Sequence, residues 1–167
     1  MRDLPRAETP AARPRDFSVD LFTSTGTVAP KYYHRLLLRV GGDSLARVDF
    51  SPGYDTTGPT WSATFAVADS AIEALWADFQ RRALRQAPTS PPIPSDQIRV
   101  GGGGMRYVVT ASGRTYALDA ERRDEWEGPI HRFSDAVSAL LPDSILASFK
   151  ARQAALPDPF SQDSAPR

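Results

Sequence analysis

The segment LLLRVGGDSLARVDF, residues 36–50, contains two alternating apolar patterns joined by a short turn. Apolar residues recur at every second position up to Val40, and again from Ala46 to Phe50. A period of two residues is typical of a β-strand with one buried face. The turn between the patterns, at residues 41–44, contains two glycines, an aspartate and a serine. This combination predicts a tight antiparallel β-hairpin.

Similar alternating segments flank the hairpin, at Phe17–Leu21 and Trp61–Val67. The four segments therefore predict an up-and-down meander. Its other two connections, Ser24–Lys31 and Ser51–Thr60, are longer than the ~2–5 residues of most hairpin loops. Because consecutive connections of a meander lie at opposite ends of its sheet, the first and third connections share one end, and these are the two long loops. Long loops grouped on a rigid sheet favour a recognition surface.

Helical patterns follow the meander. Apolar residues from Ile72 to Ala83 recur at helical spacing, and Ser70 and Glu73 have the spacing of a capping box, so a long helix is expected over residues 70–86. A second hairpin is expected around Ser112-Gly113, with short helices after Pro129 and Asp143. The predicted fold class is α+β, with an antiparallel meander sheet packed on one long helix, a second hairpin and short C-terminal helices.

The two ends of the chain differ in composition from its centre. Residues 1–15 and 157–167 are rich in proline and poor in large apolar residues, so both are predicted to be disordered tails. Residues 16–156 are predicted to form a single domain, with a proline-rich linker at residues 87–96 inside it.

Composition excludes several classes of protein. Acidic and basic residues balance at 20 each, so no net charge attracts the chain to nucleic acid or to a membrane surface. The chain contains no cysteine, which excludes disulfides and thiolate chemistry. It shows neither a signal-peptide pattern nor a long apolar run, so a cytoplasmic location is expected. Arginine supplies 18 of the 20 basic residues, which indicates a GC-rich bacterial genome.

No catalytic motif is evident in the sequence. His34 and His131 lack the spacing of metal ligands, and the glycines at 101–104 precede a strand rather than the helix of a phosphate-binding loop. We therefore predict no catalytic residue, no metal ligand and no cofactor. One alternative is an enzyme, or a small-ligand or metal-binding protein, that uses the acidic loop 119–127. Another is a structural assembly subunit that acts through its tails.

The two long loops are the strongest candidates for a functional site. They contain Thr25, Gly26, Thr27, Val28 and Tyr54, which we predict to contact a protein partner. Tyrosine is favoured in such contacts because it offers a large ring and a polar tip at low entropic cost. A second interpretation, in which Tyr54 covers the end of the core, fits the same residues.

In its order of elements, about half of the chain resembles emfourin, a family of small bacterial protein inhibitors of thermolysin-like metallopeptidases. The similar stretches are Phe17–Val40, Trp61–Gln86 and Arg106–Leu141. The loop Ser24-Thr25-Gly26-Thr27-Val28-Ala29 stands where emfourins carry a pair of glycines. This chain has one glycine there, and the strands between Leu45 and Val67 are additional to the family's pattern. The resemblance implies that the loop at residues 24–31 enters the cleft of a metallopeptidase. Since the meander places the loop at residues 51–60 at the same end of the sheet, one specific form of the predicted protein binding is a peptidase inhibitor that acts through both loops.

Overall fold

The computed structural model describes residues 11–26, 28–89, 104–119 and 124–157. The strands are β1 (Ser18–Ser24), β2 (His34–Val40), β3 (Leu45–Pro52), β4 (Trp61–Ala66), β5 (Met105–Ala111) and β6 (Arg114–Asp119). The helices are α1 (Asp69–Arg81), the short 3-10 helix η1 (Leu84–Gln86), α2 (Glu127–Ser138) and α3 (Asp143–Ala154). The predicted α+β class is confirmed.

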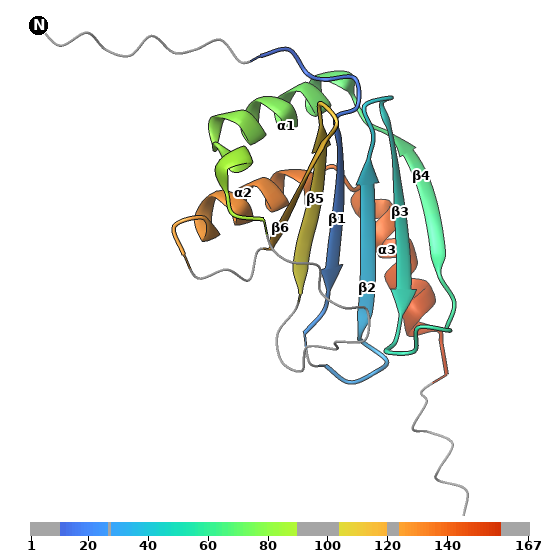
Figure 1. The fold of residues 1–167 in the computed structure, drawn as a ribbon. Helices are drawn as coiled ribbons and strands as arrows, with labels where there is room; N and C mark the ends of the chain where they lie inside the picture. The colour runs from blue at the N-terminus through green and yellow to red at the C-terminus, as the bar shows by residue number, and fades with distance from the viewer. Residues whose placement is uncertain (1–10, 27, 90–103, 120–123, 158–167) are drawn as a thin grey trace, which may run out of the picture.

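All strands form one antiparallel sheet in the order β4-β3-β2-β1-β5-β6 (Figure 1). Strands β1 to β4 form the expected meander, in which Val19 pairs with Val40 across β1 and β2. The second hairpin, β5–β6, joins the free edge of β1, where Val19 pairs with Val109. The first strand of the chain therefore lies inside the sheet rather than at its edge.

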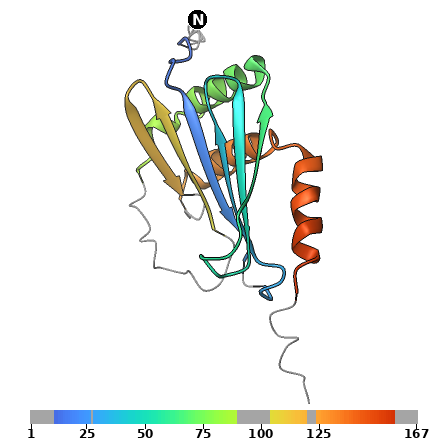
Figure 2. The same ribbon diagram turned by 90° about the vertical axis from the view of Figure 1, so that its right-hand side faces the viewer.

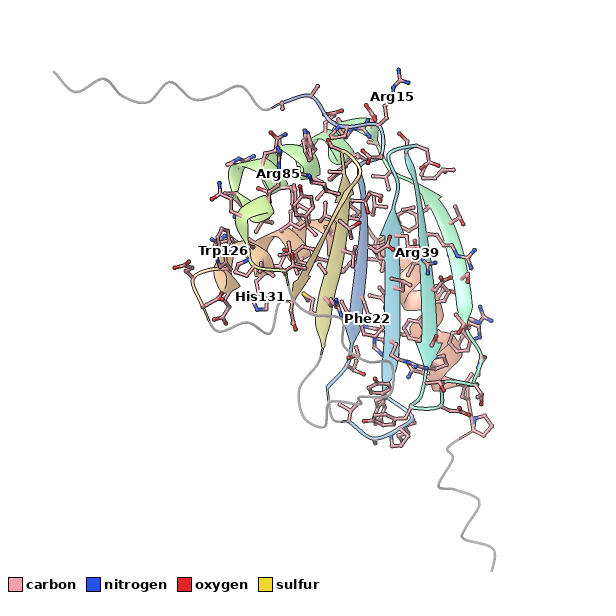
Figure 3. The ribbon with its side chains drawn as sticks, in the orientation of Figure 1. Arg15, Phe22, Arg39, Arg85, Trp126 and His131 are labelled. Carbon is pink, nitrogen blue, oxygen red and sulfur yellow. The ribbon has the colours of Figure 1, made fainter. Side chains whose placement is uncertain are left out.

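The helices pack on one face of the sheet (Figure 2). Val19 and Leu21 of β1 point into this core and are almost fully buried, as are Trp76 and Phe79 of α1. The Phe79 ring lies 5.8 Å from the ring of Phe133 on α2. The opposite face carries alternating polar residues, and none of the helices that the structure describes covers it. Figure 3 shows Phe22 and Arg39 on that open face.

Helix α1 differs from its predicted bounds at both ends. It begins at Asp69, and no side chain caps its first turn, so the expected capping box of Ser70 and Glu73 does not form. It ends at Arg81, because Ala83 adopts a left-handed conformation with φ of 52°. This bend carries Leu84 into the core, where it is fully buried. Burial of a leucine, worth about 1.5–3 kcal/mol, compensates for the backbone strain at Ala83.

Ala11 and Arg13 contact α1, although the composition of residues 1–15 predicts a disordered tail. The Trp76 indole N–H donates to the carbonyl of Ala11 at 2.7 Å. The Arg13 guanidinium binds Glu73 at 2.7 Å, pairs with Asp69, and donates to the carbonyl of Gly42 at 3.1 Å. The domain thus extends to Ala11 at least. We call residues 11–16 the N-terminal strap.

Residues 90–96 of the expected linker, and 158–167 of the expected second tail, are outside the described ranges.

Candidate functional site: a rim formed by two loops

The two long loops lie at one end of the sheet, as the meander predicts (Figure 1). Ser24, the last residue of β1, pairs with Arg35, and Pro52, the last residue of β3, pairs with His34. The turn at residues 41–44 lies at the opposite end. We call the surface formed by residues 24–26, 28–33 and 53–60 the two-loop rim.

Tyr54 joins the two loops directly. Its hydroxyl donates a hydrogen bond of 2.8 Å to the carbonyl of Val28. Its ring stacks on that of Tyr33, with centroids 3.9 Å apart and planes inclined by 16°. The backbone N–H of Gly53 donates to the Tyr33 carbonyl at 2.7 Å, and Gly53 has φ of 76°, which favours glycine. The half-buried Tyr54 therefore couples the loops, and it does so by contacts within the rim.

The first loop continues the β1–β2 ladder before it turns. The backbone N–H of Thr25 donates to the His34 carbonyl at 3.1 Å, and its hydroxyl accepts from the His34 N–H at 3.0 Å. The N–H of Tyr32 then donates to the carbonyl of Ala29 at 2.8 Å. Gly26 is half-buried and Val28 is exposed, whereas Thr27 is outside the described residues. The part of the loop that follows Thr27 is thus a closed turn.

The second loop is ordered around Asp55. Its carboxylate accepts hydrogen bonds of 2.8 Å from both the backbone N–H and the hydroxyl of Thr57. These two bonds, together with the charge of Arg35, lower the pKa of Asp55. The Arg35 guanidinium also donates to the Asp55 carbonyl at 3.0 Å. The loop is therefore tied to β2 as well as to its neighbouring loop.

Two further elements support the rim, and sequence reasoning missed both. The side-chain amide of Gln153, near the end of α3, donates to the Tyr33 carbonyl at 2.8 Å. Gly104, just before β5, exchanges hydrogen bonds with Ser24: its N–H donates to the serine hydroxyl, and its carbonyl accepts from the serine N–H. Tyr33 is therefore the central residue of the rim. In the sequence, the only indication of this role is that Tyr33 follows the first loop.

Exposed apolar side chains gather at this end of the molecule. Among the described residues, the large hydrophobic side chains that stay exposed are Phe22, Val28, Tyr32, Leu45 and Leu156. Val28 and Tyr32 belong to the first loop and are 39% and 61% exposed. Leu156 follows α3 and lines a pocket together with Tyr32. Three of the five thus share the rim end, whereas Phe22 lies on the open face and Leu45 at the opposite end.

The other candidates from the sequence are dispersed. His34 begins β2, whereas His131 lies on α2, away from the rim (Figure 3). Asp119 ends β6 and Glu127 begins α2, while residues 120–123 between them are outside the described ranges. Within the ranges that the structure describes, no three acidic or histidine side chains are grouped in a way that could hold a metal ion. None of the helices in those ranges is long and apolar enough to cross a bilayer.

No protein-family model matches this chain, and a search of curated proteins found no match.

Proposed function

We propose that this chain is a non-catalytic protein-binding domain that contacts its partner through the two-loop rim. The observation that carries the proposal is the grouping of Val28 and Tyr32, exposed and apolar, on loops that are already held in place. Exposed apolar groups cost free energy in water, and a protein partner that covers them recovers it.

The fixed conformation of the two loops favours binding. A loop that is already fixed loses little conformational freedom on association, so more of the contact energy appears as affinity. Tyr54 fixes the loops from within, through Val28 and Tyr33. In this proposal Tyr54 positions the contact residues, while Val28, with Thr25, Gly26 and Thr27 beside it, faces the partner.

Inhibition of a metallopeptidase is the specific form of this proposal that the resemblance to emfourins suggests. The loop at residues 24–31 would enter the peptidase cleft, and the loop at residues 51–60 would contact its edge. Support for this form comes from the element order and from the way in which the first loop projects beyond β1 and β2 (Figure 1).

A peptidase assay tests the specific form. Hydrolysis of a peptide substrate by thermolysin should slow as the purified protein is added, and Val28→Asp should abolish the effect, because a charge would be buried in the contact. Leu45→Asp is the matched control: Leu45 is exposed at the opposite end of the sheet, so this variant should inhibit like the parent. An unchanged rate of hydrolysis with the parent protein removes thermolysin-type peptidases as partners.

A capture experiment tests the general form. The parent, Val28→Asp and Leu45→Asp are immobilised and exposed to a bacterial lysate, and the retained proteins are identified. A protein retained by the parent and by Leu45→Asp, but lost with Val28→Asp, supports binding through the rim. Retention of the same proteins by all three variants argues against it.

A further inference from the structure

Strand β4 forms one edge of the sheet, and the backbone groups on its outer side have no partner among the described residues. It pairs with β3 in a register without a bulge. The backbone N–H of Val67 donates to the Ser44 carbonyl at 2.9 Å, so Val67 and every second residue before it face β3. The N–H and carbonyl groups of the residues between them, Ser62, Thr64 and Ala66, therefore point away from the sheet.

The outer edge of β4 is open. Figure 1 places β4 at the right-hand end of the sheet, and Figure 2, seen from that side, shows α3 beside the strand rather than over its edge. Edge strands usually avoid pairing through charged side chains, proline or bulges. Residues 56–68 contain no charged side chain, the longest such run in the chain, and Pro59 precedes the strand. The other edge strand, β6, begins with Arg114 and ends with Asp119. The edge of β4 is thus the one that can accept another strand.

The side chains of β4 suit a neighbouring strand on both faces of the sheet. Those on the open face are small and exposed, so they do not obstruct its approach. On the helical face, Trp61, Ala63 and Phe65 pack against the core but remain partly exposed. An added strand would cover these apolar groups, which contributes favourably to association.

We propose that β4 pairs antiparallel with β4 of a second copy of this chain, about a two-fold axis at Thr64. In this register Thr64 lies opposite Thr64 of the second copy, and Ser62 lies opposite Ala66 of the second copy. Every outward N–H and carbonyl group of these residues then has a partner. Phe65 lies beside Ala63 of the second copy on the helical face.

Charge favours a second copy over a different protein as the occupant. Because residues 56–68 are uncharged in both copies, no like charges meet across the axis. The same absence of charge means that the edge has no means of selecting a strand of opposite charge. A neutral edge whose hydrogen-bonding groups match those of its own copy is complementary to itself, as a two-fold interface requires.

The pairing would join two six-stranded sheets into one continuous sheet with all helices on the same face. Because the two β4 strands run in opposite directions, the two copies of the two-loop rim would lie at opposite ends of the dimer. The proposal does not depend on what the rim binds. A single strand pair is small compared with the ~1,200–2,000 Å² of stable interfaces, so we expect a reversible dimer that forms as the concentration rises.

Sedimentation velocity on the full chain tests the proposal at concentrations from about 10 µM to about 1 mM. The mean mass of the parent should rise from 18.3 kDa toward twice that value. Thr64→Pro removes an outward N–H while leaving the bonds to β3, and Thr64→Lys brings two positive charges together at the axis. Each variant should weaken dimerisation at least about tenfold. Thr115→Pro and Thr115→Lys make the same changes at an exposed residue of β6 and should dimerise like the parent.

Cysteine variants test the register. The chain contains no cysteine, so Thr64→Cys can form a disulfide only with a second copy. Residues directly opposite each other on antiparallel strands have Cα atoms about 5.5 Å apart, within the range of a disulfide. Under mild oxidation Thr64→Cys should therefore form linked dimers about tenfold faster than Ser62→Cys or Thr115→Cys, which lie away from the axis.

Three results would overturn the proposal. A parent that stays monomeric at about 1 mM would leave the edge to a different chain. Dimerisation of both Thr64 variants at the parent's affinity would place the contact elsewhere. Growth beyond the dimer would contradict a closed two-fold pair. Thermal unfolding at low concentration is the check on folding: Thr64→Lys and Thr115→Lys should melt alike, because both residues are exposed.

Discussion

The rings of Tyr33 and Tyr54 stack at 3.9 Å and join two loops that are separated by two strands of the sheet. Each loop is held by the other as well as by hydrogen bonds within its own sequence. The ring of Tyr33 makes the stacking contact. Its backbone carbonyl accepts hydrogen bonds from the Gly53 N–H and from the Gln153 side-chain amide. A change at either tyrosine should therefore alter both loops.

Tyr54→Phe and Tyr54→Ala should separate the two contacts of this side chain. Tyr54→Phe removes only the hydrogen bond to Val28 and should reduce the free energy of unfolding by about 0.5–1.5 kcal/mol. Tyr54→Ala also removes the stacking on Tyr33 and should cost about 0.5–1.5 kcal/mol more. Urea denaturation measures both, and amide exchange at Val28 and Ala29 reports on the first loop. Tyr32→Phe, on an exposed ring, is the control. Identical exchange in all variants would show that the loops are independent.

Phe79→Ala should destabilise the domain by about 3–5 kcal/mol, because Phe79 is fully buried and packs against the rings of Trp76 on its own helix, Tyr116 on β6 and Phe133 on α2. Phe22→Ala removes the same ring from the open face, where it is 39% exposed, and should cost less than half as much. Thermal and denaturant unfolding of the pair provide the measurement. Similar losses in the two variants would contradict the assignment of the core to the helical face.

Arg13→Ala should cost about 1–2 kcal/mol, because its guanidinium joins Asp69 and Glu73 at the start of α1 to the carbonyl of Gly42. The loss should shrink at high salt, since screening weakens the two ion pairs in the parent. Arg15→Ala is the matched control, because this nearby arginine is exposed and points away from the domain (Figure 3). Unfolding in urea at low and high salt tests the prediction. Equal stability of the two variants would show that the N-terminal strap does not stabilise the domain.

Asp20 and Asp49 flank Arg39 on the open face and should respond to pH in opposite directions. Burial raises the pKa of Asp20, and the charge of Arg39 opposes this only in part. For Asp49, burial also acts to raise the pKa, but hydrogen bonds from Ser62 and Arg47 and the nearby arginine charges outweigh it and lower the pKa.

These two pKa shifts determine how each carboxylate's contribution to the free energy of unfolding changes with pH. The stability that Asp49 contributes is present above its ordinary pKa of 3.8 and is lost as the pH falls through the lowered value in the folded state. The charge on Asp20 instead costs stability at neutral pH, and this cost disappears as the pH falls through its raised pKa. Asp49→Asn should therefore destabilise at pH 7 and have little effect once the pH is below the lowered pKa of Asp49 in the folded state, whereas Asp20→Asn should be neutral or stabilising at pH 7. Urea denaturation across this range measures both, and a larger loss at pH 7 from Asp20→Asn would contradict the assignment.

The meander was predictable because its signal is local. The alternation from Leu36 to Phe50 shows both the strands and the face that each residue occupies. The two long loops lie together because they are the first and third connections of the meander. The pairing of β5 with β1 was not predictable, because Val109 and Val19 are far apart in the chain and neither segment specifies its neighbour. The same holds for the Tyr33–Tyr54 stack, which depends on the tertiary arrangement of both loops.

The predicted ends of elements failed where tertiary contacts override local preference. Ser70 has the spacing of a helix cap, yet Asp69 already lies within α1, so Ser70 is inside the helix. The burial of Leu84 outweighs continuation of the helix past Ala83. The N-terminal strap lacks large apolar residues up to Asp16 and was predicted to be disordered, but it binds through backbone carbonyls and Arg13. Apolar periodicity reports none of these interactions.

The central position of β1 also constrains the order in which the domain assembles. On the ribosome, β1 to β4 emerge first and can pair as neighbours, but the second edge of β1 stays open until β5 has been synthesised. An open strand edge recruits other chains, so the nascent domain passes through an interval in which it is prone to self-association. Chains that terminate before Met105 would remain in that state, which makes the later β5–β6 hairpin a protective element for β1.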